Sequence, residues 1–247
     1  MRDFESSTLW RVSEFERARE RSGGSAFARL ERDTVLPSTL LTDLTRLEQV
    51  GASGDVLEVV AACMRHREPA LLCLQCEGLV WPVTLFPGQV VYHSPRNMTE
   101  MLPAAFARVT LLSVEPPGVR PPGHWMQERV AHVDHYRPLQ PLLWQLALDG
   151  PRPALLAEIA GPAAYRALKN PDEEGMVLGG AMRSAALRLR RESVPLREIA
   201  GWPGMSTERA SRLLNALYLG SALLASRSHP AARTGLRALL SGQKPRG

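Results

Sequence analysis

The stretch Leu196-Arg197-Glu198-Ile199-Ala200-Gly201, with the run Thr207–Tyr218 that follows it, predicts the fold of the carboxyl-terminal part of the chain. The first six residues suit a short helix that ends at a glycine, and Ser206 is a residue type that caps helix amino termini. In the longer run, apolar residues recur at the i, i+3, i+4 and i+7 spacing of an amphipathic helix. They are Ala210, Leu213, Leu214 and Leu217. A short helix, a glycine-containing turn and a longer helix together predict a helix-turn-helix.

Charge is distributed unevenly along the chain. Residues 1–150 contain 15 Lys/Arg and 18 Asp/Glu, a net charge of −3, whereas residues 151–247 contain 15 and 7, a net charge of +8. Such an asymmetry suggests that the basic part contacts a polyanion; the alternatives are docking on an acidic protein face and a merely solubilising surface. Most of the basic side chains are Arg, which can bind phosphate or carboxylate with two hydrogen bonds.

The predicted helix-turn-helix resembles the winged helix-turn-helix family, and the resemblance covers residues 180–230. Leu196–Ala200 is similar to its second helix, Ser206–Tyr218 to its recognition helix, and Leu219–Leu224 to the start of its wing. The resemblance implies duplex DNA as a partner and usually a homodimer, although no heptad seam supports a dimer here. Two sets of candidate DNA-binding residues follow. Thr207, Ser211, Arg212 and Asn215 are expected to face the groove, and Arg188, Arg190, Arg191, Arg197 and Arg227 to neutralise phosphates.

The six-residue pattern occurs a second time, forty positions earlier, as Leu156-Ala157-Glu158-Ile159-Ala160-Gly161. It leads into a shorter helical prediction, Pro162–Leu168, which meets an Asn170-Pro171 break. We expect this copy to be a degenerate helical unit that supports the second copy. The alternative is a tandem pair of winged helices.

The middle of the chain changes to a β pattern. Three β-prone runs, Ala70–Cys76, Leu79–Phe86 and Gln89–His93, are separated by Glu77-Gly78 and Pro87-Gly88, and they predict an antiparallel meander. Two amphipathic helices are expected before it, and a helix at 99–107 and a strand at 108–114 after it. Within the meander, Leu85–His93 resembles the PATAN-type modules of bacterial signalling proteins. That resemblance, over residues 50–115, implies a non-catalytic adaptor role.

The expected fold class is therefore α+β. Amino-terminal helices surround a small antiparallel sheet, and a mainly helical, winged-helix-like domain follows. The expected parts are an amino-terminal extension at 1–35, an α+β module at 36–115, a Pro-rich linker at 116–137 and a basic helical domain at 138–247.

Two chemical alternatives compete with this scheme. Cys73 and Cys76, together with His132 and His135, could supply four zinc ligands, but residues three apart on a strand point to opposite faces. A hydrolase built on the histidines near 124–135 would need a nucleophile that the spacing does not supply. The sequence contains no phosphate-binding loop, nucleophile elbow or zinc-protease motif. We therefore expect no catalytic residue, metal or cofactor.

The function expected from the sequence is that of a cytoplasmic, bacterial-type regulator. Its amino-terminal module would bind a protein or signal, and its carboxyl-terminal domain would bind DNA. The alternative is a non-catalytic adaptor in a signalling or motility assembly. No apolar run approaches the roughly 18 residues of a membrane span, and three cysteines suit a reducing compartment.

Overall fold

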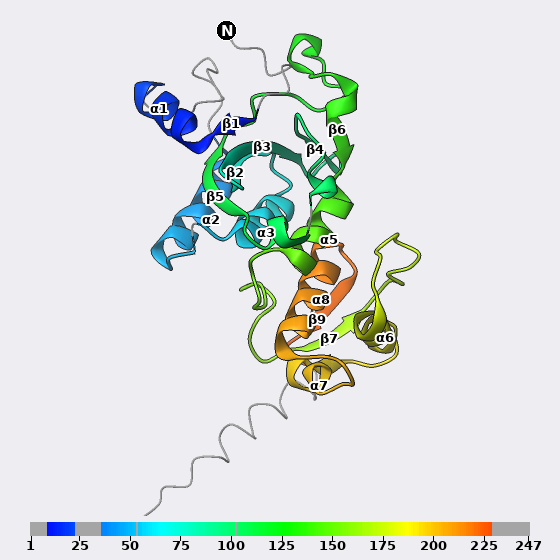
Figure 1. Cartoon of the computed structure of the whole chain (residues 1–247). Helices are drawn as coiled ribbons and strands as arrows, with labels where there is room; N and C mark the ends of the chain where they lie inside the picture. Colours follow the sequence, from blue (N-terminus) through cyan, green and yellow to red (C-terminus); the bar gives the residue numbers. More distant parts are fainter. Residues whose placement is uncertain (1–8, 23–35, 53, 102, 229–247) are drawn as a thin grey trace, which may run out of the picture. The chain divides into compact units, whose positions relative to one another are not determined.

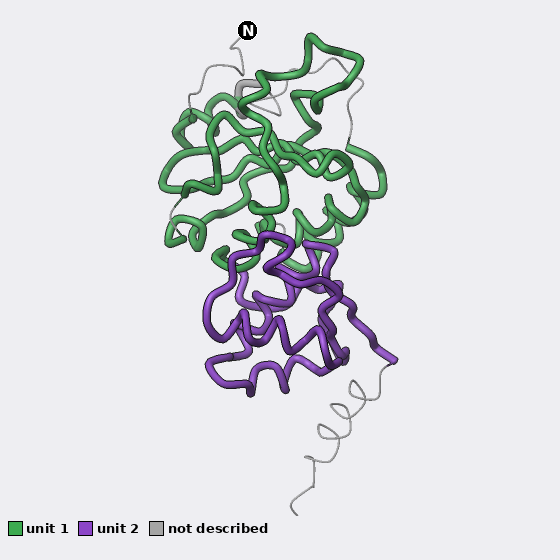
Figure 2. The backbone as a smooth tube through the Cα atoms, turned by 90° about the vertical axis from the view of Figure 1, so that its right-hand side faces the viewer, with its two compact units in different colours: residues 1–151 green, residues 152–247 purple. Residues whose placement is uncertain are grey.

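The computed structural model describes residues 9–22, 36–52, 54–101 and 103–228. They belong to two compact units, residues 1–151 (unit 1) and 152–247 (unit 2), which are coloured separately in Figure 2. Both units mix helices and strands. The helices and antiparallel sheet of unit 1 agree with the expected α+β class, whereas unit 2, expected to be mainly helical, also contains a sheet. The amino-terminal extension expected at 1–35 lies mostly outside the described residues. None of the helices in the described ranges is long and apolar enough to cross a bilayer.

Among the described residues of unit 1, three α-helices lie between the short strand β1 (Trp10–Arg11) and the remaining strands of the main sheet: α1 (Val12–Ser22), α2 (Ser38–Gln49) and α3 (Val56–His66). Helix α3 begins at Asp55, whose carboxylate accepts hydrogen bonds from the N–H groups of Leu57 and Glu58 at 3.1 and 3.2 Å. This is the usual amino-terminal cap, and it satisfies donors that have no partner within the helix. All residues from Val56 to Cys63 are buried, so α3 is a central core helix.

The sheet of unit 1 has the order β5-β2-β3-β4-β6, and the short strand β1 (Trp10–Arg11) also pairs with β3 (Figure 1). Its other strands are β2 (Ala70–Cys76), β3 (Leu79–Phe86), β4 (Val91–His93), β5 (Thr110–Glu115) and β6 (Tyr136–Pro138). Every pairing is antiparallel, so the predicted meander β2-β3-β4 is present. Glu77 and Gly78, with φ of 51° and 78°, form the tight turn between β2 and β3.

The predicted helix at 99–107 is divided into a 3₁₀ helix η1 (Met98–Glu100) and α4 (Pro103–Phe106). Met101 has an extended backbone, which ends the first of them. The strand expected at 108–114 is β5, shifted by a residue or two. Helix α5 (Leu139–Asp149) completes unit 1, with six of its residues buried.

The segment expected to be a linker at 116–137 is an ordered loop of unit 1, and the two units divide after α5 instead. Two 3₁₀ helices, η2 (Gln127–Arg129) and η3 (Val133–His135), lie in it. The Tyr136 hydroxyl donates to the carbonyl of Arg120 and accepts from the N–H of Ala131 at 2.9 Å. Because β6 also pairs with β4, both the end of the loop and its middle are held by unit 1.

In its described part, residues 152–228, unit 2 contains three α-helices and a three-stranded antiparallel sheet of order β8-β7-β9. The helices are α6 (Gly180–Leu189), α7 (Leu196–Ala200) and α8 (Thr207–Leu219), and the strands are β7 (Ala164–Ala167), β8 (Val194–Pro195) and β9 (Leu223–Ser226). The prediction of a helix at 162–168 was wrong, because this segment is the central strand β7. Its Tyr165 is fully buried and donates to the carbonyl of Ile159 at 2.6 Å.

The first copy of the repeated hexapeptide forms a single turn, in which the N–H groups of Ile159 and Ala160 both donate to the carbonyl of Leu156. It leads into β7 and not into a long helix, so it does not repeat the α7–α8 arrangement. Strand β9, expected to start a wing, pairs with β7, which precedes α6 in the chain. Up to residue 228, no strand follows β9 to form a hairpin with it.

Candidate nucleic-acid interface

Helices α7 and α8 are joined by a turn that requires glycine at position 204. Gly204 has φ of +72°, and a Cβ atom built there would lie 2.8 Å from the Cβ of Ala181 on α6. A side chain would therefore be strained by the backbone and would also collide with a neighbouring helix. Ser206 then caps α8, its hydroxyl accepting a hydrogen bond from the N–H of Arg209 at 3.1 Å. The two helices and the cap predicted from the sequence are present.

The middle of α8 does not present the polar face that the sequence suggested. Ser211 is 2% exposed and Asn215 is fully buried. The Asn215 side-chain oxygen accepts from the N–H of Leu156, and its amide nitrogen donates to the carbonyl of Ala154, both at 2.9 Å. Placing Ser211 and Asn215 at a groove was therefore wrong, since Asn215 joins α8 to the first copy of the repeat.

The other two groove candidates differ from each other. The Arg212 side chain is only 14% exposed, and its guanidinium pairs with Glu208 one turn earlier at 2.9 Å. Thr207 is exposed, as are its neighbours from Ser206 to Arg209. The first turn is therefore the part of α8 open to solvent, and Arg209 there donates to the carbonyl of Gly204 at 2.6 Å.

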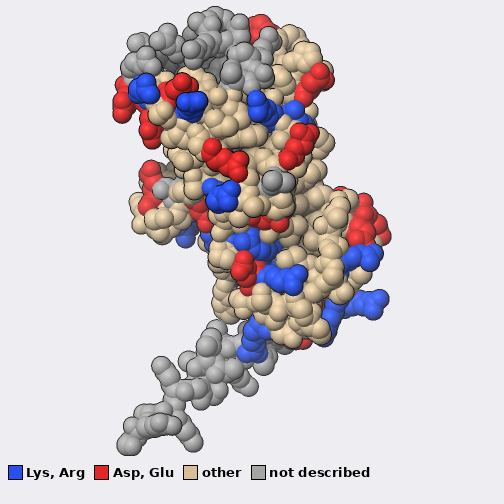
Figure 3. All heavy atoms as spheres, viewed as in Figure 1, with Lys and Arg blue, Asp and Glu red and all other residues tan. Residues whose placement is uncertain are grey.

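The candidate phosphate-binding arginines differ in whether they already have a partner within the protein. Arg188 pairs with Glu192, and its guanidinium lies 4.3 Å from the ring centre of Trp202. Arg190, Arg191 and Arg197 are exposed and pair with no described carboxylate. Arg227 is exposed and donates to the backbone carbonyl of Glu158 at 2.9 Å. Lys and Arg side chains reach the surface of unit 2 at several places (Figure 3).

Arg166 is a basic residue that the sequence prediction missed. It lies on β7, is exposed, and its Nε donates to the carbonyl of Arg190 at 3.4 Å. The segment around Arg166 was predicted to be a helix. The position of Arg166 near the end of α6 follows from the pairing of β7 with β8, and it was therefore not predicted.

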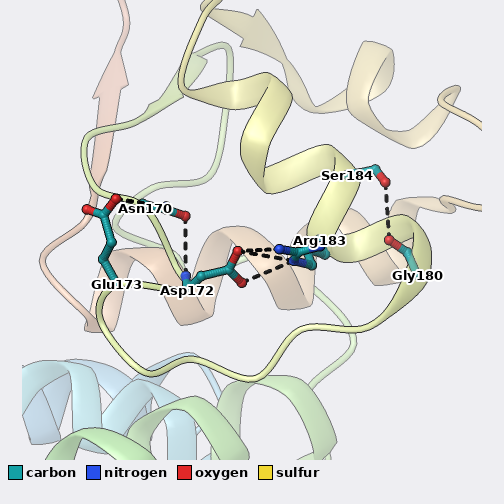
Figure 4. Close-up of polar contacts among 6 residues, drawn as sticks. All are labelled: Asn170, Asp172, Glu173, Gly180, Arg183 and Ser184. Atoms are coloured by element: carbon teal, nitrogen blue, oxygen red, sulfur yellow. Dashed lines mark hydrogen bonds and ion pairs between the residues drawn. The ribbon is translucent and has the colours of Figure 1, made fainter.

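The acidic run Asp172-Glu173-Glu174 pairs with other cations of unit 2, and Figure 4 shows the pairing of Asp172 with Arg183. Asp172 accepts three hydrogen bonds from Arg183, the shortest at 2.7 Å, and they lower the pKa of this carboxyl. Glu174 pairs with Lys169 at 3.0 Å, while Glu173 accepts from the Asn170 amide. Two carboxylates of the acidic loop thus neutralise Arg183 and Lys169.

The four residues considered as zinc ligands do not come together. In the described ranges, no group of three or more His, Cys, Asp or Glu side chains is arranged to hold a metal. Cys73 and Cys76 are buried, and the Cys76 thiol donates to the carbonyl of Ala105 at 3.5 Å. Burial is the main cause that raises the pKa of this thiol, which disfavours the thiolate that zinc needs.

A buried polar cluster lies in unit 1 where β4 meets β6. His93 is 3% exposed, and its ring centre lies 5.8 Å from that of His135 and 5.2 Å from that of Tyr136. Three buried side-chain atoms there have no hydrogen-bond partner among the described residues: His93 Nε2, His135 Nδ1 and Ser94 Oγ. Burial, together with the neighbouring His135 and Arg137, lowers the pKa of His93 to about 4.

Comparison with known proteins gives no further guidance. A scan against protein-family models matched no family, and searches of curated proteins and of solved structures found no match.

Proposed function

We propose that unit 2 binds duplex DNA and that the protein is a regulator whose unit 1 receives a protein or signal. The observation that carries the proposal is that unit 2 combines an α7-turn-α8 arrangement with exposed arginines that pair with no described carboxylate. In helix-turn-helix proteins, the amino-terminal residues of the second helix approach the base edges. Here that first turn, from Ser206 to Arg209, is the exposed part of α8.

The charge of unit 2 supports the same proposal. Unit 2 contains 15 Lys/Arg side chains, almost all of them Arg, and only 7 Asp/Glu, so its carboxylates leave a net charge of +8. When such side chains contact phosphates, counterions are released, and this favours binding to duplexes of any sequence. The winged-helix resemblance of residues 180–230 adds to the proposal, with the contact moved from the middle of α8 to its first turn.

Binding to a random-sequence duplex should weaken steeply as salt rises. The logarithm of the binding constant falls by about 0.9 per phosphate contact for each decade of salt, so three contacts predict a roughly 40-fold loss between 50 and 200 mM. Fluorescence anisotropy of a labelled duplex at several salt concentrations measures this slope. The absence of any salt-sensitive binding would reject the DNA-binding function and favour the adaptor.

The adaptor is retained as a second candidate because of one feature of unit 1. Trp125, in the loop at 116–135, is 80% exposed. The His124 ring stacks on it with centres 5.6 Å apart, and His124 Nδ1 accepts from the N–H of Met126 at 3.1 Å. Tryptophan is enriched at the energetic centres of protein interfaces, and an ordered loop loses little entropy on binding.

Photo-crosslinking tests this second candidate. A benzophenone amino acid in place of Trp125 should crosslink a protein partner in the cells that make this protein. The same group in place of Val50, which is 69% exposed on the same unit, is the matched control. Equal crosslinking from both positions would mean that the Trp125 loop is no specific interface.

A further inference from the structure

We propose that Arg166, Arg190 and Arg191 form a binding site for backbone phosphate, and that unit 2 holds duplex DNA there without reading its sequence. This inference rests on the proposed DNA-binding function and names the part of the nucleic acid that is recognised. The three residues come from two places in the chain, strand β7 and the end of α6.

The fold brings these arginines together. In the β7–β8 pairing, Tyr165 lies opposite Val194 and Ala164 opposite Pro195, so Arg166 lies beside the segment that joins α6 to β8. The hydrogen bond from Arg166 Nε to the carbonyl of Arg190 fixes this approach at 3.4 Å. Arg191 is the next residue along the chain.

The absence of anionic partners distinguishes this cluster from four of the other cations of unit 2. Lys169, Arg183, Arg188 and Arg212 each pair with a carboxylate. Arg166, Arg190 and Arg191 pair with none in residues 152–228. The negative end of the α6 dipole stabilises cations near its last turn, but it supplies only about half an elementary charge. These exposed guanidinium groups, which have no carboxylate partner in residues 152–228, are therefore available to bind an anion.

Phosphate suits these groups, since guanidinium groups bind it with paired, charge-assisted hydrogen bonds. Contacts to phosphate carry no base information. The middle of α8 cannot add that information, because Ser211 and Asn215 are buried and Arg212 is paired with Glu208. In the exposed first turn, Glu208 is held in the same pair and Arg209 donates to a backbone carbonyl, so this turn offers few uncommitted groups to base edges. Affinity without strong sequence preference is therefore expected.

The test compares a triple variant, Arg166→Gln, Arg190→Gln and Arg191→Gln, with the single variant Arg183→Gln. Arg183 lies on α6 and is 55% exposed, but it is paired with Asp172, so it serves as a matched control. Each lost phosphate contact should reduce the slope of the logarithm of the binding constant against the logarithm of salt concentration by about one. It should also weaken binding to all duplexes to a similar extent. We expect a loss of two to three in slope for the triple variant and little change for the control.

The outcomes separate the two proposals. If the wild-type protein shows no salt-sensitive duplex binding, the proposed function fails, and this inference fails with it. If the wild type binds and the triple variant keeps the wild-type slope, only the phosphate site is rejected. Discrimination among unrelated duplexes by the wild type would contradict sequence-independent binding, and stronger competition by polyglutamate than by DNA would point to an acidic protein. The double variant Arg190→Gln, Arg191→Gln removes no recorded side-chain hydrogen bond and replaces the triple variant if circular dichroism shows that the latter is unfolded.

Discussion

Replacing Asn215 with alanine should destabilise unit 2 by about 2–3 kcal/mol. The substitution leaves the N–H of Leu156, a residue with 0% exposure, without its acceptor, and an unsatisfied buried donor costs about 1–3 kcal/mol. It also leaves a small void beneath α8. The free energy of unfolding from urea titration measures the total effect. Hydrogen exchange of the Leu156 amide reports the lost bond directly.

Asn170→Ala is the matched control for this substitution. Asn170 also bonds through its side chain, to the N–H of Asp172 and to Glu173, but on the exposed acidic loop. Its loss should change the free energy of unfolding by less than about 1 kcal/mol. If Asn215→Ala were as stable as the wild type and lost DNA binding alone, Asn215 would be a base-reading residue after all.

The sequence predicted those parts of the fold that depend on local chemistry. The β2-β3 hairpin follows from the Glu77-Gly78 turn, where both residues adopt positive φ. The apolar stripe of α8 and its Ser206 cap were likewise readable from spacing and residue type. These signals lie within a few residues of the structure they determine.

The errors arise where distant segments meet. Asn215 was assigned to solvent because a short polar side chain on a helix usually faces water, but its partners lie 59 and 61 positions away. Strand β7 has the composition of a helix, and its pairing with β8 and β9 overrides that local preference. The same error concealed Arg166 from the candidate site. Proline content at 116–123 suggested a linker, whereas the Tyr136 hydrogen bonds hold this loop in unit 1.

Acidification should destabilise unit 1 through His93 by about 3 kcal/mol. The pKa of His93 is lowered from 6.5 to about 4 in the folded protein, so between these values the unfolded chain binds more protons than the folded one. The contribution of His93 to the free energy of unfolding is therefore fully present above pH 6.5. It decreases as the pH falls from 6.5 toward 4, and below pH 4 it decreases no further. A difference of about 2.5 pKa units corresponds to about 3 kcal/mol.

The physical cause is that the imidazolium would be almost fully buried beside His135 and the Arg137 guanidinium, and no carboxylate contributes to the shift. Hydrogen exchange or urea titration at several pH values should show the decline in the wild type and a flatter curve in His93→Gln. His132→Gln is the control, because that ring belongs to the same cluster but its side chain is 64% exposed. It should keep the wild-type decline. An identical decline in His93→Gln would assign the acid sensitivity to other groups and would leave the buried imidazole without a role in it.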